Sequence, residues 1–243
     1  MRRLGVVLEE HAYRLDRDDG GVSWSLIGVK ERRYERIVVR TPWIQPGDDL
    51  EEIAVRHLGP LVRRGDCAFV SEKAAVLATG RGIPAADVRP GLVARTLARW
   101  VRPVGDSRGI SIPEKMQLVI DLVGLPRVLL AALAAAVTRP FGIRGAFYVV
   151  AGRNARGMDG MRSPFEHLLL PPLHPYEARA LATRIAARLG VAVAIVDIND
   201  RGGCVRAVST SGPPSELLCA ILRDNPMGQR DARTPLGITR LAA

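Results

Sequence analysis

The sequence is poor in aromatic residues and in cysteine. Aromatic residues make up only 5% of its 243 residues although 47% are hydrophobic, so the core must consist mainly of Ala, Val, Leu and Ile. The three cysteines, Cys67, Cys204 and Cys219, are odd in number and far apart in the chain. This spacing fits neither a disulfide framework nor a CxxC zinc site, and it favours a reducing, cytoplasmic compartment.

Long apolar runs and targeting signals are also missing. The most apolar run, VLLAALAAAV at 128–137, has about half of the roughly 20 residues that a membrane-spanning helix needs. It predicts a buried helix, and no membrane partner is expected. The start of the chain, MRRLGVVLEEH, becomes acidic too early for a secretory signal, which again favours a cytoplasmic protein.

Established nucleotide and metal motifs are absent as well. There is no GxxxxGK[ST] and no GxGxxG after a strand. The four histidines do not have the spacing of zinc ligands; they are His11, His57, His167 and His174. An EF-hand interpretation of DINDRG fails, because Arg201 occupies a ligand position and Val208 stands where a bidentate Glu is required.

The charge that is present is strongly basic. Lys and Arg number 35 against 25 Asp and Glu, a formal net charge of +10. All but a few of the basic residues are arginine, whose planar fork matches phosphate and carboxylate. Two explanations stay open: the codon use of a high-GC genome, or an anionic ligand such as a nucleotide. Because the arginines are dispersed and no aromatics are interleaved with them, no nucleic-acid partner is expected.

Hydrophobic periodicity predicts strands and helices in an irregular order. A helix is expected from Asp48 as the N-cap to Gly59, and the run at 67–82 is expected to form a strand, a polar interruption and a second apolar segment. Further strands are expected at 37–42, 145–152, 167–172, 191–197, 204–211 and 235–241, and further helices at 87–102, 112–140 (two, split at Gly124 to Pro126), 175–190 and 215–225. The fold class is α+β, a mixed sheet with packed helices, because the elements do not alternate strictly. Residues 1–243 are expected to form one domain, or two intimately packed subdomains with a boundary near 140–165.

Three polar loops are the remaining candidates for chemistry. VDINDRGG (196–203) ends an apolar run with Asp197, Asn199 and Asp200, whose oxygens suit Mg²⁺ or Mn²⁺. GMDG (157–160) places Asp159 between glycines. PMGQRDARTPLG (226–237) combines glycines with both charges, a composition that can wrap a phosphate chain. For each loop, an ordinary turn or solvated loop stays open as the alternative.

In combination, these segments resemble the gamma-glutamyl ligases that act on the deazaflavin coenzyme F420. The resemblance covers most of the chain from about residue 37. TPWIQPGDDLEEI is similar to the family's nucleotide-contacting turn and the helix start that follows it. GDCAFVSEKAAVLATGR is similar to its strand, polar turn and closing GR, and GMDG with HLLLPPLHPYEA is similar to its aspartate segment. IVDINDRG is similar to its strand that ends in an aspartate, and DNPMGQRDARTPLGITR is similar to its C-terminal MG[EQ]G loop.

The resemblance implies amide formation that depends on a divalent metal (Mg²⁺ or Mn²⁺) and on GTP or another nucleotide. A substrate carboxylate is phosphorylated, and the amine of glutamate displaces phosphate from the acyl phosphate; coenzyme F420 is the candidate substrate. The implied catalytic residues are Asp159, Asp197 and Lys73. The implied metal ligands are Asp159, Asp197, Asn199, Asp200 and Gln229. The implied nucleotide contacts are Thr41, Pro42, Trp43, Ile44, Glu72, Lys73, Gly228, Gln229, Arg230 and Arg233.

The chain departs from the family pattern at several positions. Leu77 stands where the family has a lysine, Arg162 where it has an asparagine, and Ile198 directly follows Asp197. The stretch before the late helix is shortened to RGGCVRAVSTSGPPSELL. Two alternatives therefore stay open: the same chemistry on another carboxylate or amine, and a non-catalytic protein that binds a nucleotide or a deazaflavin. The expected partners are a nucleotide and an anionic small-molecule substrate, and the family's tendency to dimerise suggests a homodimer.

Overall fold

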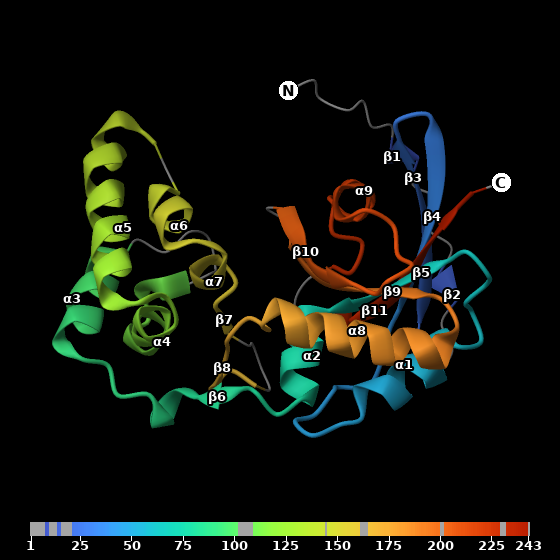
Figure 1. The fold of residues 1–243 in the computed structure, drawn as a ribbon, viewed down its shortest axis with the longest axis horizontal. Coiled ribbons are helices and arrows are strands. Elements are labelled where there is room, and N and C mark those ends of the chain that lie inside the picture. Colours follow the sequence, from blue (N-terminus) through green and yellow to red (C-terminus); the bar gives the residue numbers. More distant parts are fainter. Residues whose placement is uncertain are drawn as a thin grey trace. The chain divides into compact units, whose positions relative to one another are not determined.

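The computed structural model describes residues 8–9, 14–15, 21–101, 109–143, 145–160, 165–199, 202–228 and 232–242. The chain divides into two compact units, the first formed by residues 1–80 with 173–243 and the second by residues 81–172. The second unit is thus an insertion in the chain of the first. Strands and helices combine as a mixed sheet with packed helices, which confirms the predicted α+β class (Figure 1).

The first unit is built on an eight-stranded sheet with the order β1-β3-β4-β11-β5-β9-β10, in which β2 also pairs with β3. Among these pairs only β5 and β9 are parallel. The strands are β1 (Leu8–Glu9), β2 (Arg14–Leu15), β3 (Val22–Val29), β4 (Arg32–Val39), β5 (Cys67–Ser71), β9 (Ala192–Asn199), β10 (Gly202–Val208) and β11 (Leu236–Leu241). The strands predicted within 67–82 and at 191–197, 204–211 and 235–241 are confirmed, whereas the strand predicted at 37–42 is β4 and ends at Val39, and β3 was not predicted.

The last strand of the chain, β11, lies in the middle of the sheet. It pairs with β4 on one side and with β5 on the other, and five of its six residues are buried. At Gly237 an added Cβ would lie 2.2 Å from Cζ of Phe69 and 2.5 Å from the carbonyl oxygen of Ile37. Only glycine therefore lets the aromatic ring of β5 cross this strand.

Helices cover both faces of the sheet. Figure 1 shows α9 (Ser215–Ile221) on one face and α1 (Leu50–Leu58), α2 (Glu72–Ala78) and α8 (Pro175–Leu189) on the other. Under α9, a core forms from side chains of the helix and of the strands; it includes Phe69, Val196, Ile198, Leu218 and Leu222. The alternation of β9 places Ala194, Val196 and Ile198 on this face.

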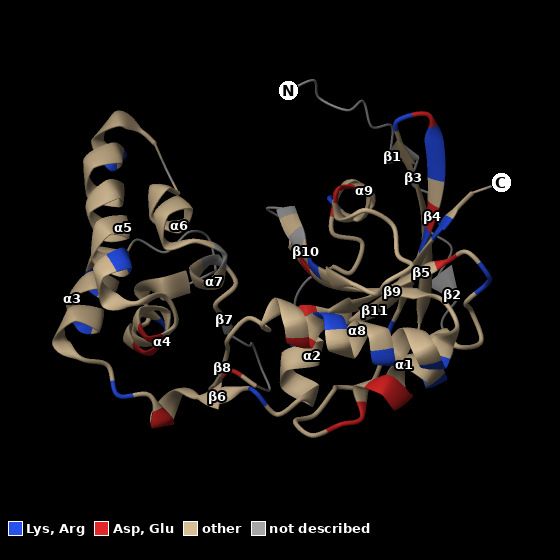
Figure 2. Cartoon of the chain, viewed as in Figure 1, with Lys and Arg blue, Asp and Glu red and all other residues tan. Residues whose placement is uncertain are grey.

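The ends of the helices follow capping chemistry. The N-cap of α1 is Asp49, which accepts a hydrogen bond from the amide of Glu52 at 3.0 Å, so the prediction of Asp48 was wrong by one residue. Asp48 instead accepts from the amide of Gln45 at 2.7 Å in the preceding turn. Gly59 ends the helix, as predicted. Figure 2 shows the acidic start of α1 beside basic positions of α8, where Glu51 pairs with Arg184 and Glu52 with Arg188.

The second unit is mainly helical. Its helices are α3 (Leu92–Trp100), α4 (Pro113–Val123), α5 (Leu125–Thr138), α6 (Ala146–Ala151) and α7 (Arg153–Arg156), with short 3-10 turns at η1 (Ala85–Asp87), η2 (Gly109–Ser111) and η3 (Arg139–Phe141). A three-stranded sheet has the order β6 (Ile83–Pro84), β8 (Leu168–Leu170), β7 (Asp159–Gly160). The predicted break between two helices is confirmed at Gly124, where φ is +90°.

Two predictions for this unit were wrong. GAFYVVAG at 145–152 was expected to be a strand, yet it forms α6, because its side chains pack against α5 in the helical core and this packing overrides their β propensity. The run at 128–137 was expected to be buried, yet only Val128 and Ala131 are buried in α5. No single helix in the described parts of the chain is long and apolar enough to cross a bilayer. Among the described residues, α4 and the segment Leu125–Phe141 reach that length and apolar composition only when taken together, and the chain bends by 118° between them.

Candidate functional site

Five segments of the first unit meet at one edge of the sheet. The parallel strands β5 and β9 both end there, at Ser71 and Asn199. Because β11 is antiparallel to β5, it begins at this edge, and β4, antiparallel to β11, ends there. β10 begins there too, with Gly202 opposite Asn199. The topology therefore gathers the polar residues that follow β4 and β5 and those at the end of β9.

Backbone hydrogen bonds join three of these segments. The amide of Thr41 donates to the carbonyl of Arg233 at 2.8 Å, and the amide of Ser71 donates to the carbonyl of Pro235 at 2.8 Å. The residues before β11 therefore lie between the turn after β4 and the start of α2. These are three of the segments for which nucleotide contacts were predicted, and they lie together.

The loop before β11 is closed by its own hydrogen bonds. The side-chain amide of Asn225 donates to the carbonyl of Gly228 at 3.0 Å, and the hydroxyl of Thr234 donates to the carbonyl of Met227. Asn225, Gly228 and Arg233 all have φ between +51° and +66°, so the loop turns sharply. The predicted residues Gln229 and Arg230 lie outside the described residues.

Glu72 at the start of α2 and Arg206 of β10 form a buried ion pair next to this edge. Arg206 of β10 reaches the carboxylate of Glu72 with both ends of its fork: Nε lies 2.7 Å from Oε1, and Nη2 lies 2.9 Å from Oε2. The backbone amide of Leu173 donates to Oε1 at 2.8 Å. Both side chains are only 5% exposed. The carboxylate predicted to contact a nucleotide is thus engaged within the protein.

Arg206 was not identified from the sequence. The pairing of β9 with β10 shifts between Val205 and Ala207, so Arg206 is the extra residue of a β-bulge. A bulge redirects the side chain of the extra residue. The one available signal was an arginine inside the apolar stretch CVRAV, and such a residue in a strand does not reveal its partner.

Burial raises the pKa of the Glu72 carboxyl above its usual range. The guanidinium of Arg206 and the amide of Leu173 act in the opposite direction, while the negative charge of Asp197 raises the pKa further. Ser71 pairs with Val196, so Glu72 and Asp197 are the next residues after a paired position of β5 and β9. The acidic end of β9 and the start of α2 therefore belong to one electrostatic cluster.

The metal ligands predicted at the end of β9 are arranged by strand alternation. Asp197 and Asn199 are half-buried and lie on the face opposite Ile198, which packs in the core under α9. Ile198 therefore departs from the family pattern at a core position, and Asn199 is the residue that shares the face of Asp197. Asp200 lies outside the described residues.

Lys73 and Leu77 are one turn apart on the same side of α2. Leu77 is 3% exposed and belongs to the core, whereas Lys73 is half-buried in the first turn. Lys73 therefore lies closer to the strand ends that form the site than Leu77, the position at which the family has a lysine.

The remaining predicted residues are divided between the units. Thr41 and Ile44 are buried, while Pro42 and Trp43 are exposed in the turn after β4. Asp159 lies in β7 of the second unit, paired with Leu170 of β8. Within the residues that the structure describes, no group of three or more His, Cys, Asp or Glu side chains is arranged to hold a metal ion. The metal site therefore stays a prediction.

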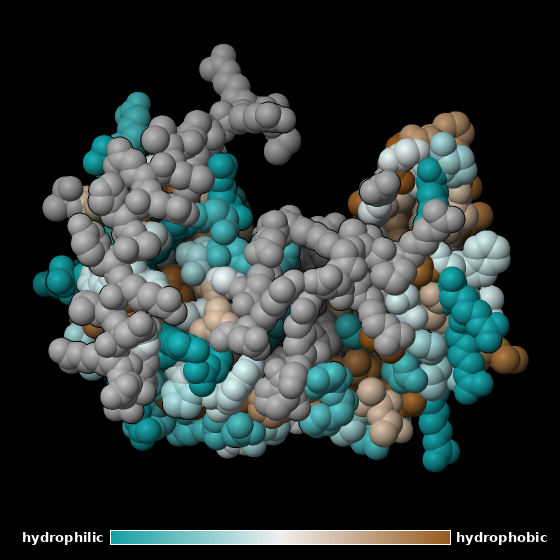
Figure 3. All heavy atoms as spheres, turned by 180° about the vertical axis from the view of Figure 1, so that it is seen from behind, coloured by the Kyte–Doolittle hydropathy of each residue, from teal (hydrophilic) through white to brown (hydrophobic). Residues whose placement is uncertain are grey.

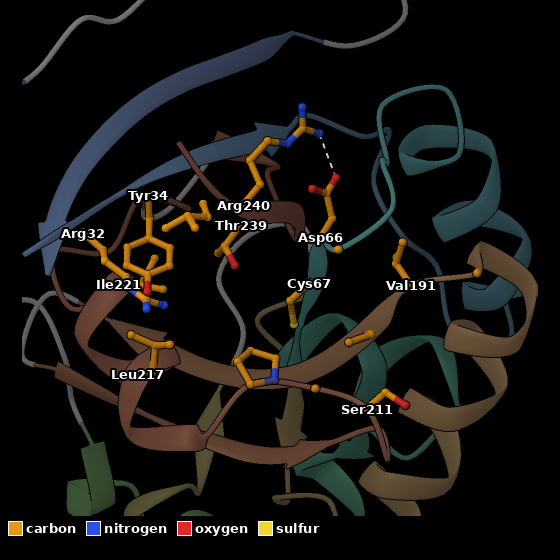
Figure 4. A pocket seen from close by; sticks show the side chains of 16 residues that line it. Arg32, Tyr34, Asp66, Cys67, Val191, Ser211, Leu217, Ile221, Thr239 and Arg240 are labelled. Atoms are coloured by element: carbon orange, nitrogen blue, oxygen red, sulfur yellow. Dashed lines mark hydrogen bonds and ion pairs between the residues drawn. The ribbon is translucent and has the colours of Figure 1, made fainter. Parts of the chain in front are cut away.

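A pocket of about 470 Å³ lies at the opposite edge, where β5 and β9 begin and β11 ends (Figure 4). Beside it, Arg240 donates to the carboxylate of Asp66 and to the carbonyl of Leu61, each at 2.8 Å. Burial, with the charge of Asp66, raises the pKa of the lining Cys67 thiol to about 12. The pocket contains none of the predicted site residues, and its buried thiol is unreactive near neutral pH.

The fold and the polar edge define an α+β protein whose loops meet at the carboxyl ends of parallel strands, where ligand sites commonly lie. A family model for F420-0:Gamma-glutamyl ligase matches residues 38–215, which is most of the chain. The chain belongs to this family, as its motifs predicted, and the family indicates gamma-glutamyl ligase activity in F420 biosynthesis. A search of the curated proteins found no match.

Proposed function

We propose that this protein forms an amide bond in two chemical steps, using GTP or a related nucleotide and a divalent metal ion. The γ-phosphoryl group passes to a carboxylate of the F420 precursor, and the amine of glutamate then displaces phosphate. The observation that carries the proposal is the joining of the turn at Thr41, the start of α2 and the loop before β11 by backbone hydrogen bonds. This arrangement provides one continuous binding edge for a nucleotide.

The cations at this edge suit an anionic co-substrate. Lys73 lies in the first turn of α2, Arg233 lies in the loop before β11, and Arg40 directly follows β4. The Nε atom of Arg40 is buried and has no hydrogen-bond partner in the described part of the chain. These cations, together with the predicted contact Arg230, hold phosphate groups by charge-assisted hydrogen bonds. Because the nucleophile is the amine of the incoming glutamate, the protein needs to orient the reactants and needs no nucleophile of its own.

Asp197 and Asn199 are the described residues best suited to a divalent ion. Both offer hard oxygen donors on one face of β9. Asp159, Asp200 and Gln229 are the further ligands of the proposed set, on the basis of the family motifs. When bound, the metal ion neutralises phosphate charge and stabilises the transferring phosphoryl group. Glu72 and Arg206 position the start of α2, and through it Lys73.

A second candidate function is the same chemistry on a different carboxylate or amine. The observation that favours it is the short path from β10 to α9, since only residues 209–214 connect Val208 to Ser215. A substrate panel with the F420 precursor, other carboxylates and several amino acids separates the two functions by the product formed.

Nucleotide binding tests the location of the proposed site. We expect GTP to bind the full chain more tightly when Mg²⁺ or Mn²⁺ is present, and Asp197→Asn to weaken this metal-dependent binding about ten- to hundredfold. Ser211→Ala, at an exposed position beside the opposite edge, is the matched control and leaves binding unchanged. Equal binding of GTP with and without metal, or an unaffected Asp197→Asn variant, would contradict the assignment.

A further inference from the structure

We propose that the helical second unit docks onto a membrane surface that carries anionic lipids. The contact is made by an apolar surface on two helices, here called the α3/α5 surface and defined by Leu92, Trp100, Leu129, Leu130, Leu133 and Val137. The proposal concerns binding only and does not depend on the ligase activity.

Helix α5 exposes most of its large side chains and buries only Val128 and Ala131. Leu129, Leu130, Leu133 and Val137 are 46%, 57%, 60% and 58% exposed. Their spacing of three and four residues places them on one stripe of the helix. Ala131, by contrast, is completely buried in the core of the unit. A helix that only had to support the core would have the opposite arrangement, because burying a leucine is more favourable than burying an alanine.

Helix α3 repeats this arrangement. Ala94 and Ala98 are buried, while Leu92 is 81% and Trp100 is 76% exposed. Nη1 of Arg139, directly after α5, donates to the carbonyl of Trp100 at 3.4 Å, so the ends of the two helices are adjacent. Figure 3 shows hydrophobic side chains at the projecting end of this unit, at the upper right of that view. The hydrogen bond from Arg139 places Trp100 at the end of α3 beside the end of α5, where Val137 is exposed.

The second unit and the two helices that form this surface are positively charged. Residues 81–172 contain thirteen Lys or Arg and six Asp or Glu, so this unit has a formal charge of +7 out of the +10 of the chain. Helices α3 and α5 contain Arg95, Arg99 and Arg127 and no acidic residue, as Figure 2 shows by colour. Exposed Leu and Trp beside arginines are the combination that binds the interface of an anionic membrane. A second copy of the same surface would instead meet it with like charge.

The length of α5 limits the mode of contact. Its 14 residues extend over about 21 Å at 1.5 Å per residue, less than the roughly 30 Å of a hydrocarbon core. The helix therefore lies in the plane of the interface. The proposal departs from the expectation of no membrane partner, which was drawn from the short length and the expected burial of the run at 128–137.

Vesicle sedimentation of the full chain tests the proposal. We expect binding to vesicles of phosphatidylglycerol and phosphatidylcholine, at least about tenfold weaker binding to phosphatidylcholine alone, and a loss of affinity with rising salt. Leu130→Glu with Leu133→Glu should lower the affinity at least about tenfold. Leu241→Glu is the matched control: Leu241 is 56% exposed in the first unit, and this variant should bind like the wild type.

Three results would overturn the proposal. One is the absence of vesicle binding, and another is equal binding of the Leu130→Glu, Leu133→Glu variant and the wild type. The third is a shift of that variant from dimer to monomer in analytical ultracentrifugation with unchanged vesicle binding, which would assign the surface to a protein interface. Because all the substituted side chains are exposed, circular dichroism and an unchanged Tm verify that each variant is folded.

Discussion

Breaking the buried pair of Glu72 and Arg206 should strongly destabilise the first unit. Arg206→Met leaves the buried carboxylate with the amide of Leu173 and removes its bidentate partner. Removing one member of a buried ion pair costs about 3–5 kcal/mol, since the other charge stays uncompensated. For a chain of this length, a cost of 1 kcal/mol lowers Tm by about 2–4 °C, so a decrease of roughly 6–20 °C is expected.

A double-mutant cycle separates the pair from its surroundings. Glu72→Leu combined with Arg206→Met removes both charges, and we expect it to cost clearly less than the sum of the two single variants. Urea unfolding monitored by circular dichroism measures the three free energies. Single variants that each cost less than about 1 kcal/mol and add without coupling would refute the reasoning, because such values are typical of exposed pairs.

The same pair predicts a pH dependence of stability. Because the pKa of Glu72 is raised in the folded state, the folded protein retains this proton at pH values where the unfolded chain has lost it. The wild type should therefore lose stability as the pH rises from the ordinary glutamate pKa through the raised one, and the contribution is fully present below that window. Glu72→Gln should lack this part of the slope in urea titrations at several pH values. A slope identical to that of the wild type would show that another group titrates.

Three further outcomes are expected. Gly237→Ala should lower the free energy of unfolding by about 3 kcal/mol, because its Cβ would collide with Phe69. Gly80→Ala, at φ +68° in open space, should lower it by only about 1–2 kcal/mol. Urea unfolding compares the two variants, and equal losses would contradict the packing of β11. With a pKa of about 12, Cys67 should resist iodoacetamide at pH 8 until the protein unfolds, and peptide mass spectrometry detecting early alkylation would contradict its burial. Arg36→Met should cost about 2–4 kcal/mol in the same unfolding assay, because the guanidinium of this buried arginine bonds the hydroxyl of Ser25, the carbonyl of Ile221 and Asp224; a cost below 1 kcal/mol would contradict this role.

Much of the fold was predictable from local patterns. The helix at 175–189 combines an apolar stripe with a capping box at its start and Gly190 in the left-handed conformation at its end, so local and tertiary preferences agree. The strands at 192–199 and 202–208 are apolar, and both were predicted from this pattern. Sequence could not predict the central place of β11, since pairing between strands far apart in the chain depends on the whole sheet.

The errors have a common physical origin in tertiary packing. The β-formers of α6 became helical because α5 offers them a packing surface, and the apolar run of α5 left its leucines exposed. Periodicity reports that a helix has an apolar face and not what covers that face.

The candidate site was predictable in its segments but not in its contacts. The turn at Thr41, the start of α2 and the loop before β11 were identified by motif, and the structure joins them. The role of Glu72 changed, because its partner Arg206 depends on a bulge that no pattern in CVRAV reveals. Alternation along β9 explains Ile198 as a core residue and leaves Asp197 and Asn199 facing the other way.

Transfer of ¹⁸O from the substrate carboxylate to the released phosphate tests the central claim most directly. If the F420 precursor carries ¹⁸O in its carboxylate, an acyl phosphate pathway places one labelled oxygen in the phosphate that glutamate displaces. We predict labelled phosphate and a glutamylated product from the wild type with GTP and metal, and neither from a folded Asp197→Asn variant. Glutamylated product with unlabelled phosphate, or equal labelling by the variant, would contradict the account.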